Sequence, residues 1–259
     1  EVFEGRLDLT LHPELAPIAQ QLGARIDFLG DFSLDEPVES LNLMIRSELA
    51  TLEISDASQS ADSQSVHVRL NAFAPNRLLK TDQVSLEAFR AEGDVSVRDD
   101  IILFDGSVLA QDVETAQARI SQIAGPLQVR FGENRVELTP EFRADDLVLT
   151  LRESPSRIAW LNLEGEISYD LETSGLSVAE LNLATPQSRV NATGRTTISG
   201  NLPTDLKGQI RLNLPEFGLY DAGVLTGEWA AIRGAQNSSR FSVDIRGTGL
   251  ADTEELYGW

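Results

Sequence analysis

The chain has no cysteine among its 259 residues, and this absence excludes disulfide bonds, thiolate metal sites and cysteine nucleophiles. It also lacks any apolar run near the roughly 20 residues that a transmembrane helix needs, and it lacks the pattern of a signal peptide. Aromatic residues make up only 6% of the sequence, which leaves few platforms on which nucleic-acid bases stack. The absence of cysteine is compatible with a bacterial periplasmic protein.

Basic residues are scarce relative to acidic ones. The 21 Lys and Arg residues stand against 41 Asp and Glu residues, so the formal net charge is −20. A field of this sign opposes binding to nucleic acid or to an anionic membrane surface. We therefore expect no nucleic-acid partner.

Catalytic motifs are missing as well. The two histidines, His12 and His67, are far apart in sequence, and neither lies in a His-Glu-x-x-His motif. Carboxylate pairs occur at Asp99-Asp100, at Asp145-Asp146 and at Glu164/Glu166, where a glycosidase pair or a calcium ion is one interpretation. In β proteins such charges more often solvate the outside of a sheet and block edge pairing. We expect no enzyme activity, no catalytic residue, no cofactor and no metal site.

The chain does have a regular alternation of apolar and polar residues. In the run from Leu161 to Leu171 the apolar residues occupy the odd positions, while polar residues fill the even ones. A helix would need apolar residues three and four positions apart, so this pattern predicts half-buried strands with one apolar and one wet face. Such strands are predicted at residues 5–11, 41–45, 66–70, 84–86, 94–97, 127–131, 136–138, 147–151, 161–171, 190–198, 208–214 and 241–247.

Only two short segments favour a helix. Pro13–Leu22 ends at Gly23, a residue type typical of helix C-caps, and Val113–Ile123 is rich in Ala, Gln and Glu. The fold class predicted is therefore all-β, with mostly antiparallel strands and one or two short helices. Strands of about 6 residues at roughly 3.3 Å per residue would span about 20 Å.

Loops and turns are predicted from polar and glycine-containing stretches. Ser55–Ser65 reads as an exposed loop, and the pairs Asp105-Gly106 and Gly125-Pro126 read as turns. No shift in composition marks a linker between halves. We expect one continuous segment over residues 1–259, with a softer division near residues 152–160.

A sheet of this size must close, pair with a second sheet, or leave its apolar side facing something else. The apolar positions are mostly Leu, Ile, Val, Ala and Gly, which would form a smooth aliphatic lining. Such a lining suits acyl chains as well as it suits a closed core. Both interpretations stay open at this point.

One part of the sequence resembles a known family. It resembles the repeating strand-turn-strand sequence pattern of TamB and its AsmA-like relatives. The segments that carry this resemblance are Ala179–Gly194 (AELNLATPQSRVNATG), Thr196–Gly200 and Asp205–Leu212. Leu9–Gly23 is similar to the short helix-like Leu-x-Pro-(Ile/Leu)-Ala element that these proteins insert between strands. The resemblance is spread over most of the chain and is clearest from about Leu161 to Leu250.

The resemblance implies an extended, curled, taco-like β-sheet groove in an internal periplasmic segment of an envelope bridge protein. In the family, such a groove carries phospholipids from the inner membrane, where the protein is anchored, towards the outer membrane of a Gram-negative bacterium. The family has also been linked to outer-membrane protein assembly, so an outer-membrane barrel partner is an expectation for regions outside this segment. The partners expected within it are phospholipid acyl chains.

No functional residue transfers individually from the family, so the candidates for a lipid groove come from the alternation alone. They are Leu161, Leu163, Ile167, Val190, Ile210, Leu212, Leu214, Phe241, Val243 and Ile245. The main alternative is a structural or adhesive β-sandwich or β-helix segment whose apolar core is closed. A third interpretation is a carbohydrate enzyme or lectin-like module built on a carboxylate pair.

Overall fold

A computed structural model describes residues 2–8, 25–32, 41–59, 64–72, 84–150, 155–197, 204–233 and 239–251. In these residues the chain forms a 16-stranded sheet whose strands are joined in antiparallel ladders. The one helical element in the same ranges is a 3-10 helix, η3 (Pro215–Phe217). The prediction of an all-β fold with mostly antiparallel strands is confirmed.

The strands follow one another in the sheet in chain order, except that the two-residue strand β6 pairs with β8 while β5 and β7 are neighbours. Their bounds are β1 Val2–Asp8, β2 Arg25–Phe32, β3 Leu41–Ser47, β4 Ala50–Gln59, β5 Gln64–Ala72, β6 Val84–Ser85, β7 Ala88–Arg98, β8 Ile101–Thr115, β9 Ala118–Phe131, β10 Arg135–Leu149, β11 Ser156–Asp170, β12 Gly175–Ala184, β13 Arg189–Thr197, β14 Thr204–Asn213, β15 Ala222–Arg233 and β16 Ser239–Ala251.

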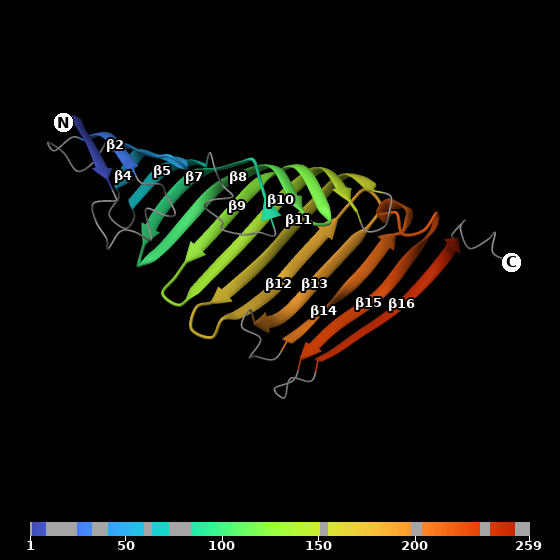
Figure 1. The fold of residues 1–259 in the computed structure, drawn as a ribbon. Coiled ribbons are helices and arrows are strands. Elements are labelled where there is room, and N and C mark those ends of the chain that lie inside the picture. The colour runs from blue at the N-terminus through green and yellow to red at the C-terminus, as the bar shows by residue number, and fades with distance from the viewer. Residues whose placement is uncertain are drawn as a thin grey trace. The chain divides into compact units, whose positions relative to one another are not determined.

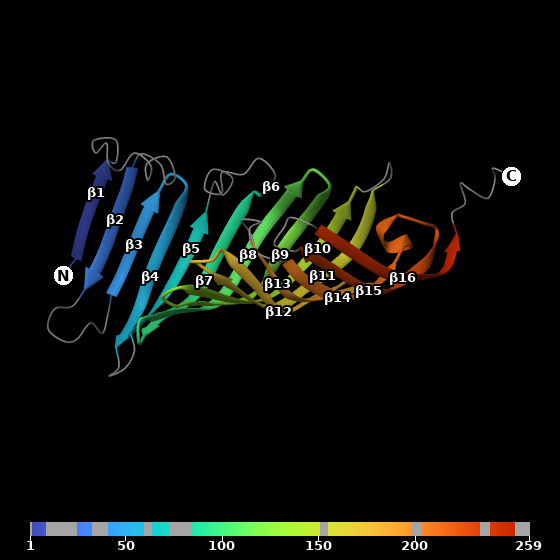
Figure 2. The same cartoon turned by 90° about the horizontal axis from the view of Figure 1, so that it is seen from below.

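The chain divides into two compact units. The first takes its residues from Glu1–Ala116 and Gln122–Gly132, and the second from Gln117–Ser121 and Glu133–Trp259. In the first unit, β1 to β5 lie side by side, drawn in blue in Figure 2. In the second unit, β12 to β16 do the same, drawn from yellow to red in Figure 1.

The register of the ladders places apolar residues opposite apolar residues. Directly opposite residues of an antiparallel pair project to the same face. In the second unit one such row contains Phe142, Leu163, Leu183, Val190 and Ile210 from five successive strands. In the first unit a comparable row contains Leu43, Ile54, Val68, Gly93 and Gly106. Each unit therefore has one apolar and one polar face.

Most strands are longer than the six residues predicted, and in β8 and β9 the reason is that stretches that read as turns lie inside the strand. Asp105-Gly106 lies within β8, and Gly125-Pro126 lies within the 14 residues of β9. Gly106 pairs with Gly93, and a Cβ on Gly106 would lie 2.3 Å from the Glu92 carbonyl oxygen. The glycine there allows a close approach of β7, not a turn.

The predicted helix at Val113–Ile123 is wrong. Strand β8 continues to Thr115, the chain bends at residues 116–117, and β9 starts at Ala118. The side chains of Val113, Thr115 and Ile120 are β-branched and fit a pleated sheet, which outweighs the helix propensity of the Ala, Gln and Glu residues among them. The other predicted helix, Pro13–Leu22, lies outside the described residues.

The predicted loop at Ser55–Ser65 is mostly strand. Strand β4 runs to Gln59 and β5 begins at Gln64, and the hydroxyls of Ser58 and Ser65 are hydrogen-bonded at 2.7 Å across the ladder. Cross-strand pairing of hydroxyls stabilises a sheet, so a polar sequence here does not prevent strand formation.

Three aspartates interrupt strands with left-handed backbone. Asp56, Asp112 and Asp146 have φ of 52°, 47° and 56°. Each is followed by a buried apolar residue, and these are Ala57, Val113 and Leu147. At Asp56 the register of β4 and β5 shifts between Ser55 and Ser58, which is a β-bulge that bends the strand and increases its twist. Beside Asp146, Leu147 lies opposite Ile158, and both side chains are buried.

Candidate functional site

The candidate site is the apolar face of the second unit, defined by the odd-numbered residues of β11 from Leu161 to Tyr169 and by their register partners. One row across this face contains Leu138, Ile167, Val178, Gly194 and Leu206. Another pair, Leu212 and Leu225, extends the face on β14 and β15.

Most of the side chains on this face are only half-buried. Leu163, Ile167, Val190 and Ile210 all keep part of their surface exposed. A sandwich core would bury such residues fully, because the second sheet covers them. Within the second unit, the described residues form one layer of strands with no second sheet over this face.

The register brings nine of the ten candidate groove residues to one face. Leu161, Leu163 and Ile167 come from β11, and the others come from β13, β14 and β16. Phe241 and Val243 are opposite Ala231 and Trp229. The remaining members are Val190, Ile210, Leu212 and Ile245.

The tenth candidate, Leu214, has a different environment. It lies just beyond β14, and its side chain is 1% exposed. Its amide donates a hydrogen bond to Gly223, and its carbonyl accepts from Phe217 and Leu219. Leu214 therefore belongs to the packed turn around η3, because the chain leaves the strand before this position.

Several residues of the face were not singled out from the sequence. On β10 and β12 they include Leu138, Phe142, Val178 and Leu183, and on β15 they include Trp229. A signal was present on β15, where Leu225, Gly227, Trp229 and Ala231 occupy alternate positions. On β10 and β12 the alternation is broken by Pro140 and by a register shift between Val178 and Leu181.

The side chain of Trp229 reaches across the neighbouring strand β14 to β13. Its register partner is Gly208, and a Cβ on Gly208 would lie 2.8 Å from Trp229 Nε1 and 1.8 Å from the Asn191 carbonyl oxygen. The indole Nε1 donates a hydrogen bond of 3.2 Å to that same carbonyl oxygen. The ring therefore presents no unpaired donor to the space above the apolar face.

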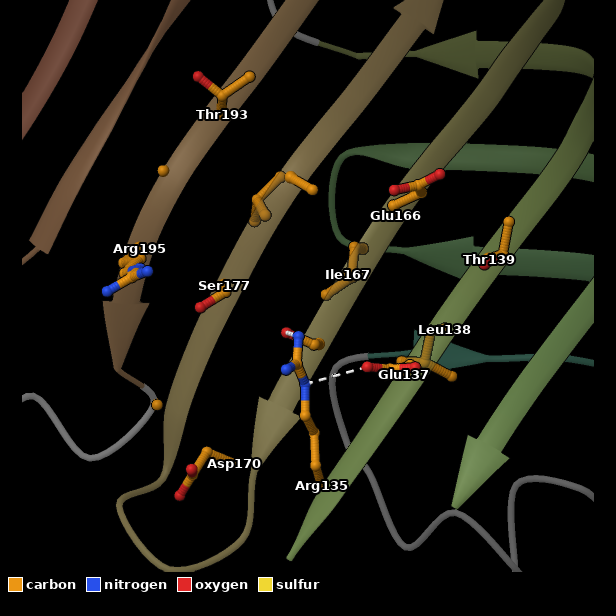
Figure 3. Close-up of a pocket in the computed structure, with 15 residues that line it drawn as sticks. Arg135, Glu137, Leu138, Thr139, Glu166, Ile167, Asp170, Ser177, Thr193 and Arg195 are labelled. Carbon is orange, nitrogen blue, oxygen red and sulfur yellow. Dashed lines mark hydrogen bonds and ion pairs between the residues drawn. The ribbon is translucent and has the colours of Figure 1, made fainter. Parts of the chain in front are cut away.

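The opposite face of the second unit is polar and contains a hollow of about 750 Å³ (Figure 3). Arg135 forms an ion pair with Glu137 at 3.2 Å and donates a hydrogen bond to Ser168 at 3.0 Å. Ser177 and Arg195 are register partners that complete one wall. A lining of this kind favours water over hydrocarbon.

Two further hollows, of about 750 and 640 Å³, lie on the same polar face. Of the candidate groove residues, Ile167 lines the first hollow, and Val190 and Ile210 line the second. The polar residues alternate with them along the same strands, so the hollows are a feature of the polar side. They are not the site predicted for acyl chains.

A carboxylate holds η3 against the turn between β12 and β13. Glu216 accepts hydrogen bonds from the hydroxyls of Thr185, at 2.6 Å, and Ser188, and from the Gln187 amide at 3.2 Å. Thr185 and Ser188 are buried, and the Ser188 hydroxyl also accepts from the Asn213 amide at 2.9 Å. The carboxylate of Glu216 and the two hydroxyls are satisfied locally, which is a structural arrangement, while the buried Asn213 Oδ1 has no hydrogen-bond partner.

The polar face of the first unit carries a network of charged side chains. Arg69 forms ion pairs with Glu53 at 3.3 Å and with Glu92 at 2.6 Å, and Arg90 also pairs with Glu92. The hydrogen bond from Arg69 is the main reason why the pKa of Glu92 falls to about 2. These contacts connect β4, β5 and β7.

His67 lies on this polar face, as the alternation predicts. Its Nδ1 is 2.9 Å from Asp94 Oδ1, and its Nε2 is 3.5 Å from Glu92 Oε1. The hydrogen bond with Asp94 raises the pKa of His67. His12 lies outside the described residues.

The carboxylate pairs are spread over turns and ion pairs. Asp99 and Asp100 form the tight turn between β7 and β8 with φ of 48° and 62°. Asp145 pairs with Arg143 at 2.8 Å and Asp146 with Arg157 at 2.9 Å.

Glu164 is register-paired with Glu141, and Glu166 with Glu180. In the part of the chain that the structure describes, no three His, Asp or Glu side chains converge on a possible metal position. No helix in those same ranges is long and apolar enough to cross a membrane.

Comparisons with known proteins give no further assignment, since no protein-family model, no curated protein sequence and no solved structure matches this chain.

Proposed function

We propose that this chain is a non-catalytic segment of a bacterial envelope bridge protein whose apolar sheet face conducts phospholipid acyl chains between the inner and outer membranes. The observation that supports this proposal is the half-buried state of the apolar face of the second unit, over which the described residues of that unit place no second layer. The resemblance to TamB and its AsmA-like relatives supports the same assignment, with a location in the periplasm.

The physical need for such a face is large. Each buried methylene is worth about 0.8 kcal/mol relative to water, so a long acyl chain crosses an aqueous gap very slowly without help. On a face of Leu, Ile and Val side chains, an acyl chain stays in apolar surroundings as it moves from strand to strand, so its free energy changes little along the way. The headgroup stays in water beyond the ends of the strands.

The strand spacing suits this role. Strands β10 to β16 span six interstrand steps, about 29 Å at about 4.8 Å per step. That is close to the ~30 Å thickness of a bilayer core. Curling of these strands into a trough is part of the same proposal.

The test compares the same charge change on the two faces. Leu212→Asp places a carboxylate on the apolar face, and Thr226→Asp, the matched control, places one on the exposed polar face of the neighbouring strand, opposite Arg211. We expect wild-type protein and Thr226→Asp to carry phospholipid, measured by mass spectrometry of an organic extract. Leu212→Asp is expected to stay folded and to lose most of it.

The alternative, a structural segment with a closed core, gives a different result. A carboxylate in a closed core must be desolvated at a cost of several kcal/mol, which is a large share of the 5–15 kcal/mol that stabilises a typical domain. Unfolding of Leu212→Asp together with a wild-type protein free of lipid would contradict the proposed function.

A further inference from the structure

The ladder between β13 and β14 has a gap in the middle of the apolar face. It is interrupted at Asn191 and Ala192, which have no partner on β14, and it resumes at Thr193. The facing residues on β14 are Gly208 and Gln209, since Val190 pairs with Ile210 on the other side of the gap. We call these four residues, Asn191, Ala192, Gly208 and Gln209, the seam.

Two side chains satisfy the backbone at the seam from opposite faces. The Gln209 amide donates a hydrogen bond of 2.7 Å to Asn191 Oδ1, in place of a backbone carbonyl. The Asn191 carbonyl accepts from Trp229 Nε1 at 3.2 Å. Asn191 is register-paired with Asn182 on the polar face, whereas Trp229 belongs to the apolar face.

Gly208 allows the indole to lie over the seam. A Cβ on this residue would be 2.8 Å from Trp229 Nε1, so the ring occupies the space that a side chain at position 208 would take. Trp160, by contrast, pairs in register with Asp145 on the polar face, and the Arg143 guanidinium lies 5.5 Å from its ring centroid. Only one of these two tryptophans therefore faces the apolar side.

Backbone groups without a hydrogen-bond partner cost free energy where they meet a hydrocarbon chain. In water an unpaired amide or carbonyl finds a solvent partner, but an acyl chain offers none. The seam would therefore be the weakest point of a lipid-carrying face unless something covered it. The indole covers it, and the bond to Asn191 leaves no donor of its own exposed.

We propose that Trp229 is a positioning residue of the acyl-binding face, which covers the seam so that a phospholipid acyl chain meets an apolar ring in place of open backbone. This inference rests on the proposed function. According to this proposal, Trp229 alone keeps the apolar surface unbroken between β13 and β14.

The test uses the whole protein and three variants. Trp229→Ala removes both ring and donor, Trp229→Phe keeps a ring without the donor, and Trp160→Phe is the matched control on the polar face. Two quantities are measured: co-purified phospholipid per protein, by mass spectrometry, and hydrogen exchange of the Gly208 and Gln209 amides, with and without added phosphatidylethanolamine. Circular dichroism checks that each variant keeps its strands.

In the wild-type protein, added lipid is expected to slow exchange at the seam amides several-fold. Trp229→Ala should lose at least two thirds of the co-purified lipid and should no longer show this lipid-dependent slowing. Trp229→Phe should exchange faster at the seam but keep most of the lipid, which a purely structural role of the hydrogen bond would not produce. Trp160→Phe should match the wild type.

The outcomes separate the two proposals. If wild-type protein carries lipid and Trp229→Ala or, should that variant unfold, Trp229→Phe shows unchanged seam exchange and unchanged lipid-dependent slowing, the role of Trp229 is refuted while the proposed function stands. If the wild-type protein neither carries lipid nor shows any slowing on its addition, the proposed function fails, and the role of Trp229 fails with it.

Discussion

The strands of the two units are held together by different interactions. In the first unit, charged side chains connect β4, β5 and β7 through Arg69, Glu53 and Glu92. In the second unit, an amide and an indole close the seam, and the Glu216 carboxylate accepts hydrogen bonds from hydroxyls and an amide. Similar alternating strands are therefore cross-linked by a network of ion pairs in one unit, and in the other by neutral donors together with single ion pairs such as that of Arg157 and Asp146.

This difference matters because the two kinds of contact respond differently to conditions. Exposed ion pairs are screened by salt and depend on pH, whereas hydrogen bonds to buried hydroxyls depend mainly on local packing. We therefore expect the first unit to be sensitive to ionic strength and acid, and the second unit to be sensitive to side-chain deletion.

The largest effect is expected for Leu214→Ala in the second unit. Leu214 is 1% exposed, and removal of a buried leucine side chain typically costs about 2–5 kcal/mol. Leu212→Ala, on the half-buried apolar face of β14, should cost clearly less. Urea denaturation of both variants measures the difference, and equal losses would mean that the apolar face is as closed as the turn.

A smaller loss is expected for Glu216→Ala. The substitution leaves the buried hydroxyls of Thr185 and Ser188 without their acceptor, which costs about 1–3 kcal/mol. Glu164→Ala, which removes an exposed carboxylate from β11, is the control and should be nearly neutral. The thermal midpoint at low and high salt checks this, and a loss that disappears in 1 M salt would show that charge, not hydrogen bonding, is responsible.

Acid should weaken the first unit through Glu92. Its pKa is lowered from 4.5 to about 2, so its contribution to stability is present above pH 4.5 and is lost as the pH falls through about 2. Glu92→Gln is expected to flatten the pH dependence of unfolding in this window. Glu4→Gln, on β1, is a control that should leave the dependence in place.

The smallest effect is expected for His67. Because its pKa is raised above 6.5, its contribution is fully present below pH 6.5 and is lost as the pH rises through the folded pKa. An NMR titration of the imidazole should show a midpoint above 6.5, and Asp94→Asn should move the midpoint back. A His67 midpoint at or below 6.5 would contradict the contact with Asp94.

Alternation was a good guide to the strands and to their faces. It correctly predicts that Leu163, Val190 and Ile210 share a face, because a period of two leaves no other arrangement in a sheet. It fails at Val113–Ile123, where cross-strand pairing overrides helix propensity, and at Gly106, where a glycine marks close approach of two strands. Such contacts come from other strands and leave no local signal.

The details of the candidate site were harder to predict. Leu214 continues the alternation that places Ile210 and Leu212 on the apolar face. However, the strand ends one residue earlier, so the side chain of Leu214 is buried in a turn. The seam depends on which residues of β13 and β14 fail to pair, and the covering by Trp229 depends on Gly208 one strand away. No spacing within a single strand contains that information.

The most direct test of the central claim uses the tryptophans as reporters of the two faces. Two variants, Trp160→Phe with Trp259→Phe and Trp229→Phe with Trp259→Phe, leave one fluorescent residue on the apolar or the polar face. Each is titrated with phosphatidylethanolamine brominated in the acyl chain, because bromine quenches only a nearby indole. The account predicts strong quenching of Trp229 and little of Trp160. Equal quenching of both, or none at Trp229, would contradict an acyl chain lying on the apolar face.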